Sequence, residues 1–368
     1  MSGMLSADPH TPFHQSQRIN SLIIQQLFQN MIYQFQPILK QTLWGGDKIA
    51  ALKHLSDAPT HVGESWELSG IEGHVSVVAH GPEAGLTLPH LIAKHGADLL
   101  GRRNFERFGT EFPLLIKIID ARQDLSVQVH PNDEIARRHG HPRGKTEMWY
   151  LLPSDPDASL LVGLRHDLSP EQFAAMVADS TICDALTHYR VSAGDCFFLP
   201  AGRIHSIGAG SMLVEIQQTS DVTYRIYDFD RTDHHGNRRP LHTALAAEAI
   251  DFHAHPDYQT HYTPTDDSRT LLVDCPHFTT SLWTVRHQCL VDYSPLDSFV
   301  VLICTAGHGT LIDNHHAEHP LSMGDTLLLP VTTTQIELRG QLQVIETYVG
   351  EDQAQDTKTA ANITHENN

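Results

Sequence analysis

Two polar side chains stand two positions apart in an otherwise apolar stretch of the sequence. In LSVQVHPND, residues 125–133, Gln128 and His130 alternate with Val127 and Val129 just before a proline. Side chains of a β-strand alternate between its two faces, so the amide and the imidazole point to one side and the valines to the other. A polar group buried without a partner costs about 1–3 kcal/mol, so this pair of side chains requires a polar partner.

A repeat within the chain adds a third polar position. Residues 191–207, VSAGDCFFLPAGRIHSI, and residues 321–337, LSMGDTLLLPVTTTQIE, both run from a Gly-Asp turn through a short apolar strand to a proline and a loop. The residue eleven positions after the glycine is His205 in the first copy and Gln335 in the second. Such internal similarity predicts that one structural unit occurs twice in the chain.

The segments that precede the two copies are related as well. EMWYLLPSDPDASLLVG, residues 147–163, matches SFVVLICTAGHGTLIDN, residues 298–314, so that Ser298 stands where the first copy has Glu147. Only the first copy keeps ionisable side chains at these positions. We therefore expect a site in the first unit and a supporting role for the second.

The elements that must position these residues are mostly short strands. β-Branched and aromatic runs bounded by Gly, Pro and Asp predict strands at 64–70, 74–81, 112–121, 125–131, 147–153, 158–164, 195–201 and 212–229. Two helices are predicted, at 87–101 and at 169–186, the second with Ser169 as its N-cap and Pro170 as its first residue. Many strands without alternating helices predict a mainly β fold, a sandwich or a barrel, with a few covering helices.

The Gly-Asp turn, strand, proline and histidine of residues 194–205 resemble the pattern of the cupins, jelly-roll β-barrels that hold a metal between their sheets. This resemblance makes Gln128, His130, Glu147 and His205 candidate ligands, and such a set binds a divalent metal such as Zn²⁺. A single histidine among the 27 of this chain is more often a surface or core residue than a ligand. The joint fit of the four, with the second copy as an internal control, favours a metal, and we predict one zinc ion per chain.

The same patterns divide the chain. We expect two cupin-type jelly-roll β-barrels, a catalytic one with helical segments at residues 33–240 and a metal-free one at residues 241–350. Residues 1–32 are predicted to be a flexible extension, because Gln and Asn interrupt their apolar residues and leave neither a signal sequence nor a membrane helix. Residues 351–368 are polar and are predicted to be a disordered tail.

Composition and charge exclude several functions. The chain is 40% hydrophobic and 19% charged, as is usual for a globular protein, and its formal charge of −19 argues against nucleic acid or an anionic membrane as a partner. Five scattered cysteines without a CxxC pair indicate reduced thiols and a cytoplasmic location. Because GxGxxG, GxxxxGKS/T and GxSxG are all absent, any phosphate group must be bound by Lys, Arg and Ser side chains.

Over most of residues 33–350, the chain resembles the short bacterial form of the type I mannose-6-phosphate isomerases. The resemblance rests on QPILKQTLWGGDKI, GESWELSG, FPLLIKIIDA, LSVQVHPND, GKTEMWYLL, FFLPAGRIHSIG and TSDVTYRIYDF. It implies a zinc-dependent aldose–ketose isomerase that interconverts mannose 6-phosphate and fructose 6-phosphate through an enediol or enediolate. It also implies a small sugar phosphate as the binding partner and a monomer or weak homodimer as the assembly.

The resemblance assigns further residues of the cleft. It implies that Lys145, Asp221 and Arg225 are catalytic and that Ser126 and Lys117 lie near the sugar phosphate. Two of these assignments also fit strand geometry, because residues two or four apart on an extended chain share a face, as Lys145 does with Glu147 and Asp221 with Arg225. We further expect Asp221 to hold the Arg225 guanidinium in one orientation.

Trp44 is a further candidate for the substrate cleft. It is followed by two glycines, which let a backbone approach a ligand closely. A tryptophan is more often a core residue than a sugar platform, and we expect Trp44 to flank the cleft.

The residues alone leave three functions open. Two histidines and one carboxylate also bind iron in cupin oxygenases, although such sites do not require a neighbouring lysine and arginine. A non-catalytic sugar-binding or regulatory protein of two cupin units is the third alternative. For an isomerase, the group that moves the proton could be a metal-bound hydroxide, a carboxylate or a lysine.

Overall fold

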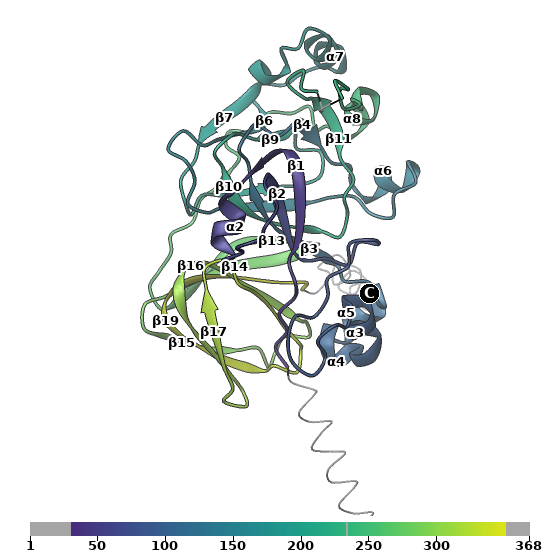
Figure 1. The fold of residues 1–368 in the computed structure, drawn as a ribbon. Coiled ribbons are helices and arrows are strands. Elements are labelled where there is room, and N and C mark those ends of the chain that lie inside the picture. Colours follow the sequence, from purple (N-terminus) through teal and green to yellow (C-terminus); the bar gives the residue numbers. More distant parts are fainter. Residues whose placement is uncertain (1–30, 233–234, 351–368) are drawn as a thin grey trace, which may run out of the picture.

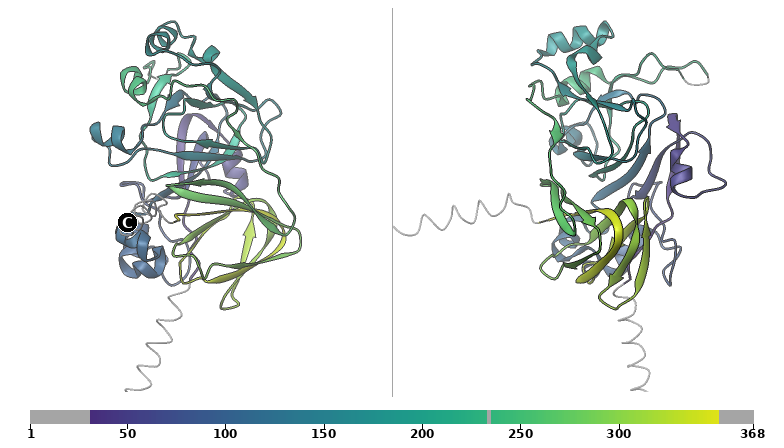
Figure 2. Two further views of the ribbon diagram at one scale, coloured as in Figure 1. Left: turned by 180° about the vertical axis from the view of Figure 1, so that it is seen from behind. Right: turned by 90° about the vertical axis from the view of Figure 1, so that its left-hand side faces the viewer.

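The computed structural model describes residues 31–232 and 235–350, which form two β-units lying one above the other (Figure 1). The first unit contains strands β1 to β12 and the second unit contains strands β13 to β19. Helices α3 to α5 lie beside the second unit, whereas α7 and α8 lie at the far end of the first unit (Figure 2). The predicted N-terminal extension and C-terminal tail fall almost entirely outside the described residues.

The first unit is a sandwich of two antiparallel sheets with the strand orders β1-β2-β3-β10-β5-β8-β12 and β11-β4-β9-β6-β7. The larger sheet consists of β1 (Ile38–Gly46), β2 (Val62–Leu68), β3 (Leu114–Asp120), β10 (Met212–Gln218), β5 (Glu147–Leu151), β8 (Cys196–Leu199) and β12 (Gln259–Thr260). The smaller sheet consists of β11 (Tyr224–Tyr227), β4 (Val127–Val129), β9 (His205–Ile207), β6 (Ser159–Leu164) and β7 (Leu186–Arg190).

Strand β10 shows how this sandwich is covered on both sides. All seven of its residues are buried, and Val214 and Ile216 pack into a core that also contains residues of the second unit. Leu213 faces the other way, into the core between the two sheets, where it joins Trp149. Because side chains alternate, Glu215 shares the face of Leu213. A carboxylate on this inner face therefore needs a charged or hydrogen-bonding partner between the sheets.

Short helices connect the strands. They are α2 (Lys48–Leu52), α3 (Leu88–His95), α4 (Ala97–Leu100), α5 (Arg102–Phe108), α6 (Asp133–Arg138), α7 (Pro170–Ala178) and α8 (Thr243–Ala249), with the 3₁₀ turn η1 (Ile182–Ala185). Both predicted helices exist, but each is interrupted. The first is divided by Gly96, and the second ends at Ala178, while Ser169 forms the predicted N-cap within a complete capping box. Among the described residues, no helix is long and apolar enough to cross a membrane.

The second unit is built around two long strands. Its elements are β13 (Ser268–Cys275), β14 (Phe278–Val285), β15 (Gln288–Asp292), β16 (Val300–Asp313), β17 (Glu318–Ser322), β18 (Thr326–Leu329) and β19 (Gln335–Tyr348). The first half of β19 pairs with β15 and its second half with β14, so the strand passes from one layer to the other. Where β19 passes between the layers, Gly309 of β16 faces Gly340 of β19. The two backbones approach too closely for a side chain, since a Cβ on Gly309 would lie 2.1 Å from the Arg339 carbonyl oxygen.

The predicted mainly β fold is confirmed, with two facing sheets in the first unit whose outer strands stay unpaired on one side within the described residues. The strand predicted at 74–81 is wrong. This segment forms only single bridges, from Val77 to Thr87 and from Val78 to Phe35, because its backbone hydrogen bonds are divided between two short neighbouring segments. The predicted strand at 212–229 is two strands, β10 and β11.

The division of the chain at residue 240 stays a prediction. Strand β12 pairs with β8 of the first unit, and Ala246 and Ala249 of α8 pack into a core formed by β4, β11 and α7. These contacts favour a boundary after residue 260, just before β13 begins at Ser268.

Candidate metal centre

Three ionisable side chains meet at one end of the first unit, between its two sheets. His130 follows β4 directly, Glu147 begins β5 and His205 begins β9. Strands β4 and β9 are neighbours, with Gln128 opposite His205, while Glu147 reaches across from the larger sheet. The three residues meet because each stands at the end of a strand and faces the inside of the sandwich, as the predicted strands imply.

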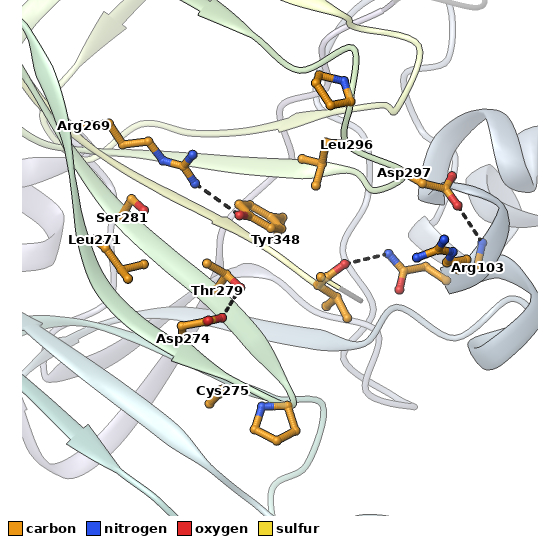
Figure 3. A pocket seen from close by; sticks show the side chains of 15 residues that line it. Arg103, Arg269, Leu271, Asp274, Cys275, Thr279, Ser281, Leu296, Asp297 and Tyr348 are labelled. Carbon is orange, nitrogen blue, oxygen red and sulfur yellow. Dashed lines mark hydrogen bonds between the residues drawn. The ribbon is translucent and has the colours of Figure 1, made fainter. Parts of the chain in front are cut away.

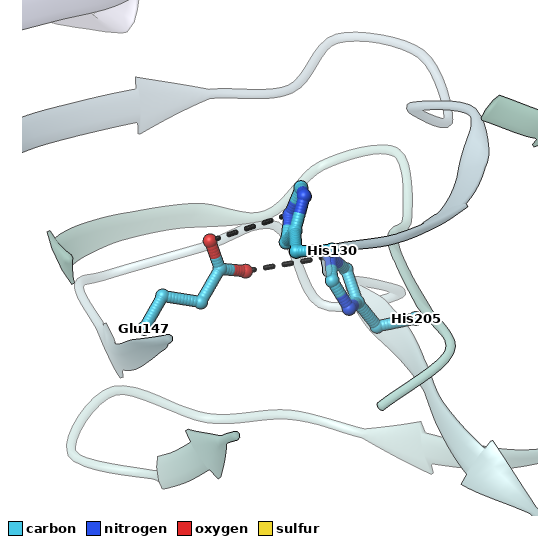
Figure 4. Close-up of side chains that lie close together, drawn as sticks. All are labelled: His130, Glu147 and His205. Atoms are coloured by element: carbon cyan, nitrogen blue, oxygen red, sulfur yellow. Dashed lines mark ion pairs between the residues drawn. The ribbon is translucent and has the colours of Figure 1, made fainter. Parts of the chain in front are cut away.

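The three side chains face one another at short distances (Figure 4). Nε2 of His130 lies 3.5 Å from Glu147 Oε2, and Nε2 of His205 lies 3.3 Å from Glu147 Oε1. The exposed fractions are 2% for His130, 0% for Glu147 and 1% for His205. Among the described residues, this is the one group of three or more His, Cys, Asp or Glu side chains whose potential ligand atoms all lie within 4.8 Å of one another.

The histidine rings are held in the orientation that metal ligands adopt. Nδ1 of His130 lies 2.8 Å from the Val222 carbonyl oxygen, and Nδ1 of His205 lies 2.8 Å from the Arg203 carbonyl oxygen. A carbonyl only accepts hydrogen bonds, so the proton of each neutral ring is on Nδ1, and Nε2 carries the lone pair that a metal would bind. Nε2 of His130 and Oε1 of Glu147 are buried without a hydrogen-bond partner, which fits a site for a divalent metal.

Gln128 completes the predicted set. Its amide group lies 3.3 Å from His205 Nε2, and its side chain stands on the same face of β4 as that of His130. The nitrogen and oxygen of an amide exchange places by a half-turn, so the same position can present Oε1 to an ion.

Two lysines and a second glutamate surround the carboxylate of Glu147. Lys145 Nζ lies 2.9 Å from Glu147 Oε2 and 3.5 Å from Glu215 Oε1, and Lys117 Nζ lies 3.0 Å from Glu215 Oε1. Trp149 donates from Nε1 to the other oxygen of Glu215 at 3.1 Å. All five side chains are buried. The two lysines are thus the counter-ions of Glu147 and Glu215. Their positive charges are held next to the candidate ligands.

Burial and these charges shift the pKa values of the cluster. Burial lowers the pKa of His205 to about 4 and that of His130 well below its usual range, with Lys145 adding to both shifts. Both rings are therefore neutral at neutral pH. Burial and the neighbouring Glu215 raise the pKa of Glu147, while Lys117 and Lys145 outweigh burial and lower the pKa of Glu215.

Arg225 lies beside this cluster but not as expected. It pairs with Gln128 across β11 and β4, and its Nη1 donates to the Pro240 carbonyl oxygen at 3.0 Å. Asp221 precedes β11, is exposed and forms no ion pair with Arg225, so the expectation that it orients the guanidinium is wrong. Residues 221–223 lie outside the strand, which begins at Tyr224, so the shared strand face on which that expectation rested does not extend to Asp221.

Two arginines that the sequence analysis did not single out lie in this region. Arg231 and Arg239 both donate to Asp228, at 2.8 Å and 2.6 Å to its Oδ1, and both charges lower the pKa of Arg225 after burial does. Arg225 Nε is buried without a hydrogen-bond partner. Two guanidinium groups therefore bind the Asp228 carboxylate, and that of Arg225 lies near enough to feel all three charges. Their loop residues, DFDRTDHHGNRRP, follow no strand or helix periodicity that could have indicated this.

A cavity of about 840 Å³ is lined by Arg239, Glu64 and Trp44, among others, and reaches the cluster only through Glu64. Trp44 is only 5% exposed and also packs in the core between the sheets, so it is both a core residue and part of the cavity wall. Glu64 accepts a hydrogen bond from Trp66 Nε1 and lies 3.8 Å from Lys117 Nζ. The cavity thus adjoins the charges at the candidate metal centre.

Ser126 and Glu215 complete the description of the site residues. Ser126 is buried and stands two residues before Gln128, on the same face of the chain. Glu215 was missed in the sequence, although MLVEIQQ shows the same signal as LSVQVHPND, a polar residue at an alternating position of an apolar strand.

Family models match both units. Residues 32–189 match a model described as the catalytic domain of type I phosphomannose isomerase, and residues 268–349 match one described as the cupin domain of mannose-6-phosphate isomerase.

Relatives and solved structures cover nearly the whole described chain. The mannose-6-phosphate isomerase ManA of Bacillus subtilis is 34% identical over 319 residues, 86% of this chain and 98% of the relative. Mannose-6-phosphate isomerase of Streptococcus mutans gives the same identity and coverage. The crystal structure of mannose 6-phosphate isomerase from Bacillus subtilis superposes with a TM-score of 0.77 at 28% identity, over 86% of this chain and 99% of that one. A putative mannosephosphate isomerase from Archaeoglobus fulgidus shares the fold with a TM-score of 0.71 at 21% identity, over 88% and 98% of the two chains.

Proposed function

The chain belongs to the type I phosphomannose isomerase family, and from this premise we propose that it interconverts mannose 6-phosphate and fructose 6-phosphate with the help of one bound zinc ion. The observation that carries the proposal is the convergence of the buried ligand atoms of His130, Glu147 and His205 beside the buried cation Lys145. A metal site alone is shared by many cupins, whereas a lysine and a group of arginines next to it suit an anionic sugar substrate.

The ligand set we propose is Gln128, His130, Glu147 and His205. Two neutral imidazoles, a carboxylate and an amide oxygen fit zinc, and the carbonyl groups that fix both histidine rings are the usual outer partners of such ligands. When bound, the ion supplies positive charge that polarises the oxygens of the substrate and stabilises an enediolate by several kcal/mol.

The reaction moves one proton from C2 to C1 of the sugar while O2 loses a proton and O1 gains one. Lys145 places an ammonium group where negative charge develops on these oxygens, and Glu147 and Glu215 hold it there. We propose Glu64 as the carboxylate that carries the carbon-bound proton, because it lines the cavity and lies outside the ligand set. Glu64→Gln should then keep the bound metal and lose turnover.

The phosphate group requires a local cationic site, because the chain carries a formal charge of −19 that repels a dianion. Of the cations suggested by the sequence, Lys117 and Lys145 are balanced by the two buried carboxylates Glu147 and Glu215. Arg231 and Arg239, in contrast, share the single carboxylate of Asp228, so positive charge is in excess there. We therefore propose that Arg225, together with Arg231 and Arg239, binds the phosphate, since guanidinium groups grip oxyanions with paired hydrogen bonds.

Two coarser predictions accompany this proposal. All five cysteines are free thiols, which supports a reducing, cytoplasmic compartment. We further propose that the protein acts as a monomer or weak homodimer.

A coupled assay for fructose 6-phosphate, run before and after chelation, tests the proposed function. The purified protein should convert mannose 6-phosphate, lose that activity with a chelator and regain it with Zn²⁺. Activity that survives complete removal of metal would contradict the proposed role of the ion. A protein that consumes oxygen with Fe²⁺ and does not isomerise the sugar phosphate would be a cupin oxygenase instead.

A further inference from the structure

A second pocket, of about 1020 Å³, lies at the end of the second unit where β16 begins and β19 ends, and Arg103 and Asn104 of α5 also line it (Figure 3). This is the end that corresponds to the candidate metal centre. The sequence repeat relates β5 to β16, and Glu147 stands at the start of β5 as Ser298 stands just before β16. A volume of this size accommodates a small organic molecule.

The floor of the pocket is the inner face of three adjacent strands. Leu271 of β13 stands opposite Ser281 of β14, which stands opposite Glu346 of β19, so the three side chains share one face. Arg269 and Tyr348 lie on this same face, toward the pocket. The packed interior of the second unit continues below them, and the pocket is thus the open end of that interior.

A buried carboxylate anchors the floor. Glu346 is 0% exposed, accepts hydrogen bonds from Trp283 Nε1 at 2.8 Å and Tyr293 OH at 2.6 Å, and pairs with Arg269 at 2.8 Å. The Arg269 side chain is 39% exposed and also donates to Tyr348 OH at 3.2 Å, so one guanidinium links the buried glutamate to the pocket. Both contacts are made by Nη2, and an arginine held by two partners can present its remaining N–H groups in a fixed direction.

One polar group of the floor has no partner within the described structure. Ser281 is 1% exposed, lines the pocket, and its hydroxyl oxygen makes no hydrogen bond. A buried hydroxyl without a hydrogen-bond partner lowers stability. A ligand or a water molecule that hydrogen-bonds to Ser281 would remove this cost. The neighbouring hydroxyl of Thr280, on the other face of β14, is satisfied by Thr347.

The charges of the pocket favour a neutral ligand. Its ionisable lining consists of two arginines and two aspartates, and Arg269 is already paired with Glu346. No excess of positive charge is left for a phosphate. Donors and acceptors are mixed, and the Tyr348 ring and the exposed side chain of Leu271 provide apolar surface. Sugars present hydroxyl groups that both donate and accept, next to apolar C–H faces that pack on such surfaces.

We propose that this pocket of the second unit is a binding site for a neutral sugar of hexose size, separate from the catalytic cleft. Ser281 and Arg269 hydrogen-bond its hydroxyl groups, and the ring of Tyr348 packs against its apolar face. The proposal does not depend on the reaction of the first unit.

Hydrogen–deuterium exchange on the zinc-loaded full-length protein tests the site, with D-mannose, D-fructose and D-glucose as probes and inorganic phosphate as the anionic control. At least one hexose, at millimolar concentration, should protect peptides that contain residues 268–281 and 343–350. The half-saturating concentration should rise about tenfold in Ser281→Ala, as for a lost hydrogen bond to a neutral group, and protection should vanish in Tyr348→Ala. Thr280→Ser, the matched control on the opposite face, should bind like the parent.

The turnover of mannose 6-phosphate separates this site from the catalytic cleft. Ser281→Ala and Tyr348→Ala should leave kcat and KM unchanged, and protection at the second unit should persist in His205→Ala. The proposal is overturned if none of the three hexoses protects these peptides at 50 mM, if phosphate protects them instead, or if the protection disappears in His205→Ala. Unchanged protection in a correctly folded Tyr348→Ala, verified by its melting temperature, would also overturn it.

Discussion

Four strands run in the same order in both units, β2-β3-β10-β5 in the first and β13-β14-β19-β16 in the second, and the third strand of each carries a buried glutamate. Glu215 receives a hydrogen bond from Trp149 Nε1, and Glu346 receives one from Trp283 Nε1. The cation differs: two buried lysines hold Glu215, whereas one half-exposed arginine holds Glu346. The framework of the fold thus keeps a carboxylate in both units.

The difference lies at the strand ends. In the first unit Glu147 and His205 present ligand atoms to one another, whereas in the second unit Ser298 accepts from Asn104 at 3.0 Å and donates to the Phe299 carbonyl at 2.9 Å, and Gln335 is exposed. A serine satisfied within the protein has no need of an ion. The second unit therefore lacks an ionisable side chain at both of the positions that the repeat relates to Glu147 and His205.

The largest expected effect is the loss of activity on removing a ligand from the first unit. His205→Ala should lower kcat/KM about 10³-fold or more, since losing several kcal/mol of charge stabilisation corresponds to such a factor. The fold should survive, because the cores of the unit are apolar. The corresponding change in the second unit, Gln335→Ala, should leave kcat/KM within twofold. Equal losses in both variants would contradict the division of roles.

The buried glutamates should differ in their contribution to stability. Glu215→Gln removes the negative charge that faces two buried lysines and should lower the free energy of unfolding by about 3–5 kcal/mol. Glu346→Gln should cost less, about 1–2 kcal/mol, because Arg269 is 39% exposed and water replaces part of the interaction. Urea unfolding of both variants measures the difference, and a larger cost for Glu346→Gln would reverse the comparison.

Acid should destabilise the metal-free protein through the histidine that the second unit lacks. Burial holds the pKa of His205 at about 4, whereas the unfolded chain takes up that proton near pH 6.5. The unfolded state therefore binds more protons between these values, and stability falls as the pH drops from 6.5 to 4, by about 3 kcal/mol for a fully buried ring. His205→Gln introduces the residue that the second unit has at this position. In this variant, the part of the fall in stability with decreasing pH that comes from His205 should disappear. Urea midpoints measured in chelator across this range provide the test, and an unchanged slope would refute the assignment.

A smaller effect is expected at the proposed phosphate site. Arg225→Lys should raise KM and lower kcat, each about three- to tenfold, because the lysine keeps the charge but loses the planar fork. Arg269→Lys, the change to the arginine of the second unit, should alter neither constant. Steady-state kinetics with mannose 6-phosphate would measure both, and an Arg225→Lys enzyme with both constants within twofold of the parent would return Arg225 to a purely structural role.

The parts of the site that the sequence indicated follow local rules. Gln128 and His130 could be placed on one face because strand side chains alternate, and His205 and Glu147 because a degenerate second copy marks their positions. The contact of Arg225 with the Pro240 carbonyl could not be inferred, since a loop without periodicity brings Pro240 to the strand. The prediction of a strand at 74–81 fails for a similar reason: its valines fit a strand pattern, but pairing depends on other segments.

The ion content of the purified protein tests the central claim most directly. Elemental analysis should find one zinc ion per chain in the parent, nearly none in Glu147→Gln and His205→Ala, and one in the second-unit variants Gln335→Ala and Glu346→Gln. The claim is contradicted if Glu147→Gln and His205→Ala retain as much zinc as the parent, or if the parent binds a second tight ion that is lost when residues of the second unit are changed.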